Sequence, residues 1–313
     1  MDAQCESSLV QAYGFLKTGD TVRAKALVED ALARDLNQAE VIFALGCVNF
    51  WADKLPRPLG ETPEERGDFL INSWERFTAF AGGGADYERC FGAVRAGVFT
   101  RALDAFLEAL NTHRGGNEGE LYRKAGICHK KLGEYETALS FLSEASALLN
   151  GAPPVLAEMA DCYALCGNER AAKVLFRDAF FADPSGIDLS FLDCQMIVDL
   201  IRRVEKKGFS GDALAGWIPV YGVLYGVFNI KRGLRPHEAG KLSQEITALE
   251  NELKEAEPPR ELAVPKLINH YFWLIDHLAA SHAERSRIEQ TLLKIKLLDP
   301  EVHKQYTGGQ PGA

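Results

Sequence analysis

Residues 119–152 read GELYRKAGICHKKLGEYETALSFLSEASALLNGA, and residues 153–186 read PPVLAEMADCYALCGNERAAKVLFRDAFFADPSG. The two stretches carry one pattern of glycine, small and bulky residues with a period of 34 residues. The coinciding positions are Gly133 and Gly167, Ala138 and Ala172, Leu142 and Phe176, and Ala145 and Ala179. A fixed period of this length is typical of stacked helical hairpins. The pattern therefore predicts an all-α chain built from repeated pairs of helices.

Each stretch divides into two helices joined by a turn. In the first stretch we expect helices over 120–131 and 135–148, with Gly133 in the turn, because glycine tolerates the backbone of a helix exit. In the second stretch Pro184 is expected to stop the second helix, since proline cannot continue it.

The second stretch resembles the tetratricopeptide repeat (TPR) family. The family has a turn glycine, then Ala, an aromatic residue and Ala on the second helix, and a closing proline. The matching residues here are Gly167, Ala172, Phe176, Ala179 and Pro184. Met159-Ala160 stands where the family has Leu-Gly. The resemblance implies a right-handed superhelical solenoid of TPR-like helical hairpins.

The same spacing extends towards the N-terminus, so residues 1–186 are expected to hold five TPR-like repeats. Their windows are 5–38, 39–82, 83–116, 119–152 and 153–186. The second window carries an insertion at 54–62 between its two helices. In the third window Gly97 stands at the turn position.

The clean repeat fades after the fifth window. Residues 187–306 predict a divergent helical region with a degenerate repeat near 269–302, and residues 307–313 predict a disordered tail. The apolar run 213–228 predicts a helix buried in the protein, with membrane contact as the alternative. Residues 237–257 predict an amphipathic helix packed on its own chain, with a coiled-coil seam as the alternative.

Composition narrows the classes of function. The 313 residues are 47% hydrophobic and carry a formal net charge of −9, which argues against broad nucleic-acid binding. The seven cysteines are odd in number and lack close pairing motifs, so no disulfide framework is expected. The N-terminal Met1-Asp2-Ala3-Gln4-Cys5 lacks the features of a secretory signal, and we expect a cytoplasmic protein.

The resemblance also implies where a partner would bind, since TPR arrays bind mainly on a concave face lined by the first helix of each hairpin. Carried over, this face is aromatic at its N-terminal end and basic towards the middle. Its predicted residues are Tyr13, Phe43, Phe50, Trp51, Tyr87, Phe91, Arg95, Arg123, Lys130 and Lys131. Such a surface suits a peptide with an apolar anchor and an acidic flank. The alternative for Phe43, Phe50 and Trp51 is packing against the insertion 54–62.

No motif for catalysis stands out in the sequence. Residues 82–84, a run of glycines, have no strand before them and no phosphate-binding pattern after them. His270 and His277 share a helix face and could contribute to a metal site, but a surface or interface role is favoured. Cys162 and Cys166 lie four apart and could supply half of such a site, without evident further ligands. We therefore expect no enzyme activity, no cofactor and no metal.

Two functions follow from these patterns. The favoured prediction is a scaffold or adaptor that binds a protein or peptide in the concave groove of a TPR array. The alternative is a small-molecule or lipid-binding accessory protein that works beside a transporter or membrane assembly, with the insertion 54–62 closing a pocket over the aromatic groove.

Overall fold

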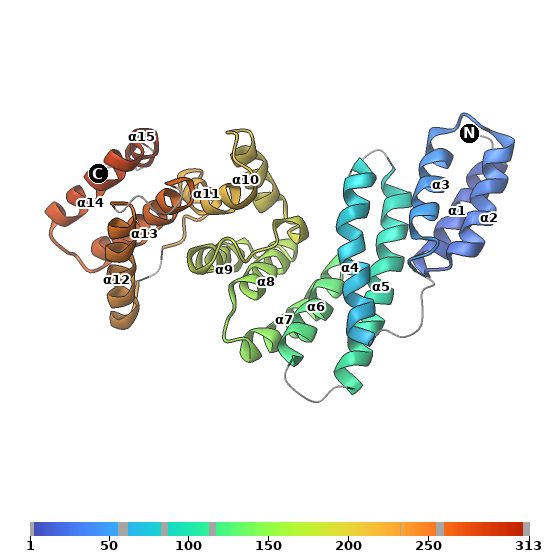
Figure 1. Cartoon of the computed structure of the whole chain (residues 1–313), viewed down its shortest axis with the longest axis horizontal. Coiled ribbons are helices and arrows are strands. Elements are labelled where there is room, and N and C mark those ends of the chain that lie inside the picture. Colours follow the sequence, from blue (N-terminus) through green and yellow to red (C-terminus); the bar gives the residue numbers. More distant parts are fainter. Residues whose placement is uncertain are drawn as a thin grey trace. The chain divides into compact units, whose positions relative to one another are not determined.

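The computed structural model is helical in both of its compact units (Figure 1). It describes residues 3–55, 62–82, 87–112, 117–231, 233–254 and 260–308. Fifteen α-helices and no strand occur in these described residues, which confirms the all-α class. The units are Met1–Gly151 and Ala152–Ala313, so the division falls inside the expected repeat array rather than at residue 186.

Unit 1 holds the first seven helices. They are α1 (Ala3–Lys17), α2 (Thr21–Arg34), α3 (Ala39–Trp51), α4 (Pro63–Phe80), α5 (Glu88–Thr112), α6 (Glu118–Lys131) and α7 (Tyr135–Leu148). The predicted helices 120–131 and 135–148 correspond to α6 and α7.

Unit 2 holds the remaining helices. They are α8 (Pro153–Leu165), α9 (Glu169–Ala182), the short 3-10 helix η2 (Leu189–Phe191), α10 (Gln195–Glu205), α11 (Gly211–Leu224), α12 (Pro236–Glu252), α13 (Arg260–Ala280), α14 (Arg285–Leu298) and α15 (Pro300–Gly308). α13 and α14 cover the expected degenerate repeat near 269–302 and pack against each other.

Three helix pairs, α1–α2, α6–α7 and α8–α9, are hairpins closed by the same kind of turn. The turn glycines all have positive φ, and they are Gly19, Gly133 and Gly167. In the α6–α7 turn the Gly133 amide donates to the Lys130 carbonyl, and the Glu134 amide donates to the His129 carbonyl, both at 2.9 Å. Equivalent bonds close the other two turns. In each turn, these two hydrogen bonds satisfy the last carbonyl groups of the first helix.

The window 83–116 is not a hairpin in its described part, because α5 runs through it as one helix. Gly97, the predicted turn residue, lies inside α5, and a Cβ atom there would overlap the Leu16 carbonyl of α1. Val98 follows Gly97, whereas Asn168 follows Gly167 and caps α9 by accepting a hydrogen bond from the Ala171 amide. The prediction of a turn at Gly97 is therefore wrong. Gly97 instead allows α5 and α1 to approach closely.

α4 also departs from a simple second hairpin, since it packs side by side with α5 (Figure 1). Thr62 caps α4 in a capping box with Glu65, and Pro63 occupies its first turn. α3 meets α4 through aromatic rings, with Trp51 and Phe77 centroids 5.5 Å apart. Residues 56–61 of the insertion 54–62, and residues 83–84 of the glycine run, lie outside the described residues.

The core of unit 2 is built around α11 and α13, which pack together. The apolar run 213–228 begins in α11, where Ile218 and Val220 are fully buried. Nowhere in the described part of the chain does a helix combine the length and apolarity needed to cross a bilayer. α12 packs on α13, and its buried stripe is Leu242, Ile246 and Leu249.

The last described helix extends further than predicted. α15 extends to Gly308, so the expectation of a disordered tail is wrong at residues 307 and 308. The Tyr306 ring of α15 stacks on Phe272 of α13 with centroids 4.4 Å apart, which explains why the helix is held there. Residues 309–313 lie outside the described residues.

Candidate functional site

Aromatic side chains follow one face of α3 in unit 1. Phe43, Gly46 and Phe50 share this face, because residues spaced by three or four lie on one side of a helix. The Phe43 ring packs on Tyr87 with centroids 4.7 Å apart. Phe80, the last residue of α4, covers Gly46 and stacks on Phe50 at 5.6 Å. We call Phe43, Phe50, Phe80 and Tyr87 the aromatic face.

The aromatic face is exposed at Phe80 and carries a cation at one end. The Phe80 residue is 60% exposed, whereas Phe43, Phe50 and Tyr87 are half-buried. Lys54 places its Nζ atom 4.1 Å from the Phe50 ring centroid and donates to the Phe50 carbonyl at 2.7 Å. This position combines a cation–π contact with a charge-assisted hydrogen bond.

Three of the predicted aromatic residues point to the interior instead. Trp51 is fully buried, and the element on which its ring packs is α4, through Trp74 and Phe77. Phe91 is half-buried against the same two rings. The Tyr13 hydroxyl donates to Glu40 at 2.8 Å, and burial raises the pKa of Tyr13. Trp51 and Tyr13 therefore belong to the core of unit 1 and do not line an exposed groove.

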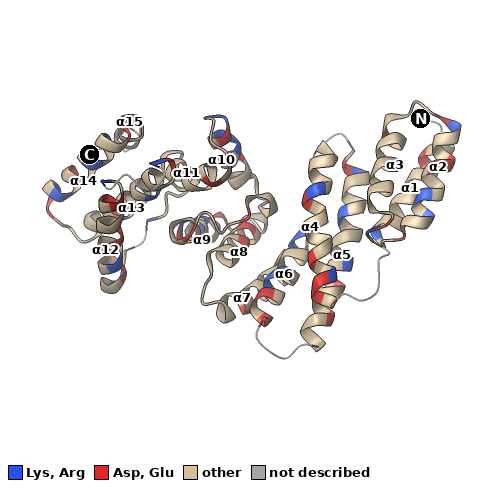
Figure 2. Cartoon of the chain, viewed as in Figure 1, with Lys and Arg blue, Asp and Glu red and all other residues tan. Residues whose placement is uncertain are grey.

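The predicted basic part of the groove is largely absent from the surface. Lys130 and Lys131 are buried, with 2% and 8% of their surface exposed. Arg123 forms an ion pair with Glu120 at 2.8 Å. Arg95 is exposed on α5. Figure 2 shows Lys and Arg interspersed with Asp and Glu along the helices of unit 1, so these residues do not form one continuous basic strip.

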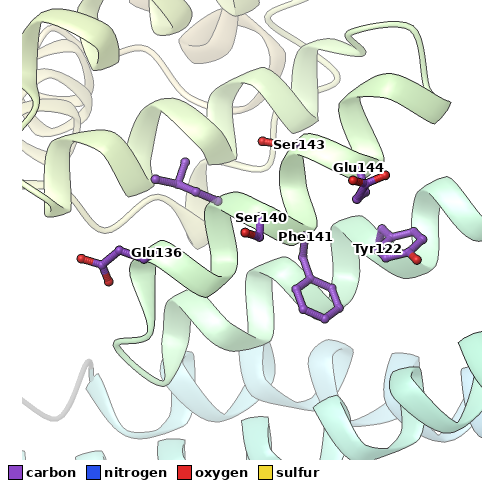
Figure 3. A pocket seen from close by; sticks show the side chains of 7 residues that line it. Tyr122, Glu136, Ser140, Phe141, Ser143 and Glu144 are labelled. Carbon is purple, nitrogen blue, oxygen red and sulfur yellow. The ribbon is translucent and has the colours of Figure 1, made fainter.

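A shallow pocket of about 390 Å³ lies on the hairpin α6–α7 (Figure 3). The rings of Tyr122 and Phe141 form one side of it, with centroids 5.8 Å apart. Figure 3 shows Glu144 close to Tyr122, whereas Glu136 points away from it. The pocket carries carboxylates and hydroxyls on an exposed surface, with no buried polar side chain directed into it.

Unit 2 contains a larger pocket of about 680 Å³ along α12, lined also by residues of α9 and α13. We call it the α12 pocket. His270, singled out in the sequence, lies in its wall and is 2% exposed. Its Nδ1 atom is 2.7 Å from the Lys266 carbonyl, and its Nε2 atom is 3.3 Å from Oε2 of Glu245. Burial lowers the pKa of His270, against the opposing effect of Glu245.

The remaining candidates do not form a metal site. Across the described residues, no group of three His, Cys, Asp or Glu side chains is placed to hold a metal ion. His277 is half-buried, Cys162 is buried and Cys166 is exposed. Asp276, near the predicted histidine pair, instead forms a buried ion pair with Arg177.

Two residues of the site escaped the sequence analysis. Phe80 joins the aromatic face because the end of α4 lies over Gly46, and Lys54 joins it because its side chain folds back over Phe50. The spacing of 43, 46, 50 and 54 along the chain is the only sequence signal for this arrangement, and it does not include Phe80.

Comparison with known proteins gives no match, either to a protein-family model or to a curated protein. The resemblance to the TPR family therefore rests on the residues of the repeated pattern. The shared turn geometry at Gly19, Gly133 and Gly167 adds a physical likeness between the three hairpins themselves.

Proposed function

We propose that this chain is a cytoplasmic interaction scaffold of the TPR type, a right-handed solenoid of helical hairpins that binds a protein or peptide partner. The repeat of 34 residues and the three alike turns support the solenoid. None of the seven cysteines, all within the described residues, forms a disulfide, which is compatible with a reducing compartment.

The exposure of Phe80 is the observation that carries the proposed binding role. The Phe80 residue remains 60% exposed although its ring stacks on Phe50, so it leaves apolar surface in contact with water. A partner that covered this surface would gain a binding free energy of roughly 25 cal/mol for each Å² buried. Aromatic residues are also enriched among those that dominate binding energy at protein interfaces. Phe43 and Phe50, half-buried beside it, extend the apolar surface along α3.

The charge at the end of the aromatic face suggests the chemistry of the partner. Lys54 lies over Phe50 and would attract a carboxylate that follows an apolar side chain docked at Phe80. The proposed ligand is therefore a protein segment with an apolar anchor and an acidic flank. The described geometry supports only the aromatic end of the groove predicted from the sequence.

The test is affinity capture from lysate of the source cell, with proteins identified by mass spectrometry. Phe80→Asp places a charge on the aromatic face at an exposed site, so the fold should persist. Val22→Asp is the matched control, because Val22 is 74% exposed on α2 of the same unit and is not part of the aromatic face. We expect a partner that the wild type and Val22→Asp retain and Phe80→Asp loses.

Other outcomes would oppose the proposal. A partner retained equally by all three proteins binds away from the aromatic face. Capture of no specific protein by the wild type would favour the small-molecule alternative instead.

A further inference from the structure

The α12 pocket combines apolar walls with two polar groups, the buried His270 and the partly exposed Glu245, and apolar walls with a few polar groups are typical of a small-molecule site. Phe181 of α9 forms one wall and packs its ring on His270 at 5.0 Å. Leu242 and Leu249 of α12 are buried and form another. Its volume of about 680 Å³ falls within the range of roughly 300–1,000 Å³ that such sites occupy.

His270 and Glu245 present two hydrogen-bond acceptors to each other. The Nδ1 atom of His270 lies 2.7 Å from the Lys266 carbonyl, which can only accept, so Nδ1 carries the proton of the neutral ring. Nε2 is then an acceptor. It faces Oε2 of the Glu245 carboxylate, a second acceptor, at 3.3 Å. A ring protonated at both nitrogens would satisfy both partners, but burial lowers the pKa of His270 and favours the neutral form.

The charges of the pocket favour a positive ligand. Its wall carries the three carboxylates of Glu238, Glu245 and Glu252 and the two ammonium groups of Lys241 and Lys266. Lys241 lies 3.6 Å from the other oxygen of Glu245 on an exposed stretch of α12, so that pair is weakened by solvent. Oε2 of Glu245 faces His270, and an N–H donor placed between them would donate to both acceptors.

We propose that the α12 pocket binds a primary ammonium compound with an apolar body, whose N–H groups donate to Nε2 of His270 and Oε2 of Glu245. One ammonium group carries three hydrogen-bond donors and no acceptor, so it can donate to both of the acceptors that His270 and Glu245 turn towards each other. The apolar body would lie against Phe181 and the leucines of α12. This inference is independent of the aromatic face in unit 1.

Calorimetric titration of the full chain tests the proposal. The probes are hexylamine, 2-phenylethylamine and tryptamine, each compared with the carboxylate of matched body: hexanoate, phenylacetate and indole-3-acetate. At about pH 7.5 the amines are protonated and an unperturbed histidine is mostly neutral. We expect at least one amine to bind with a Kd below about 1 mM, and its carboxylate to bind at least about tenfold more weakly.

Glu245→Gln distinguishes the proposed contact from nonspecific binding of amines in the pocket. The glutamine amide removes the charge and can itself donate to Nε2 of His270, so amine binding should weaken by about tenfold or more. Glu252→Gln is the control, because Glu252 lines the same pocket, whereas the contact of His270 is with Glu245. It should weaken binding by less than about threefold. Circular dichroism of each variant verifies that the helices are retained.

Three results would overturn the proposal. The first is equal affinity for a carboxylate and its matched amine. The second is unchanged affinity of Glu245→Gln for the amine. The third is a folded wild type that binds none of the three amines. A direct second readout is the nitrogen chemical shift of the His270 ring, whose Nε2 resonance should move when the amine binds and stay in place with the carboxylate.

Discussion

Glycine serves two separate purposes in unit 1. At Gly133 the φ angle is +85°, a conformation in which side chains are strained, and the residue ends α6. At Gly97 the backbone is helical and the missing side chain matters instead, because any Cβ would overlap the Leu16 carbonyl. One residue type therefore stops one helix and lets another continue past its neighbour.

Substitution of Gly97 by alanine tests the close contact of α1 and α5. Alanine favours a helix by up to about 1 kcal/mol, but the overlap with the Leu16 backbone should outweigh this and lower the free energy of unfolding by about 2 kcal/mol. Gly92→Ala is the control in the same helix, since an added Cβ there meets nothing within 4 Å. Urea unfolding followed by circular dichroism should show Gly92→Ala equal to or more stable than the wild type. Equal stability of the two variants would contradict the contact.

At the scale of elements, two of the three turn glycines are followed by a residue that caps the next helix. Asp20 and Asn168 follow turn glycines and accept hydrogen bonds from the amides of Arg23 and Ala171. Val98, after Gly97, has no side chain that can do this, and α5 continues. Glu134, after Gly133, makes no side-chain capping bond either, yet α7 begins there. The missing cap at Val98 is therefore not sufficient to explain the continuous helix α5, and the close contact of Gly97 with the Leu16 carbonyl is the feature that sets this window apart.

The aromatic rings between α3 and α4 divide into a buried and an exposed set, and mutation should separate them. Trp51→Ala removes a fully buried ring that packs on Trp74 and Phe77, so it should lower the free energy of unfolding by about 3–5 kcal/mol. Phe80→Ala, at an exposed site, should lower it by less than about 1 kcal/mol. Both are measured by urea unfolding. A small effect of Trp51→Ala would mean that its ring lies at the surface.

At the scale of the whole molecule, the described helices bury six of the seven cysteines and leave Cys166 exposed. Burial raises the pKa of Cys128, which keeps its thiol protonated and unreactive. A thiol reagent such as dithionitrobenzoate should therefore react rapidly with about one thiol in the native protein, and with all seven after unfolding in urea. Cys166→Ser should abolish the fast reaction. Several fast thiols in the native state would show that the helices do not protect them.

Much of the local structure could be read from residues close together in the chain. The period of 34 and the glycines at 133 and 167 predict helices and turns because the bonds involved join residues three to five apart. The amphipathic stripe was predicted in the same way, from Leu242, Ile246, Leu249 and Leu253. The first three are buried in α12, and Leu253 is half-buried at its C-terminal end.

The candidate sites depended instead on contacts between segments that are distant in sequence. Whether Trp51 or Phe80 faces water is decided by how α4 lies over α3, and spacing along one helix carries no information about the neighbouring helix. The pairing of His270 with Glu245 joins α13 to α12 across 25 residues. Periodicity identifies the buried side of a helix, but the partner that buries it, and the polar groups that meet there, are set by tertiary packing.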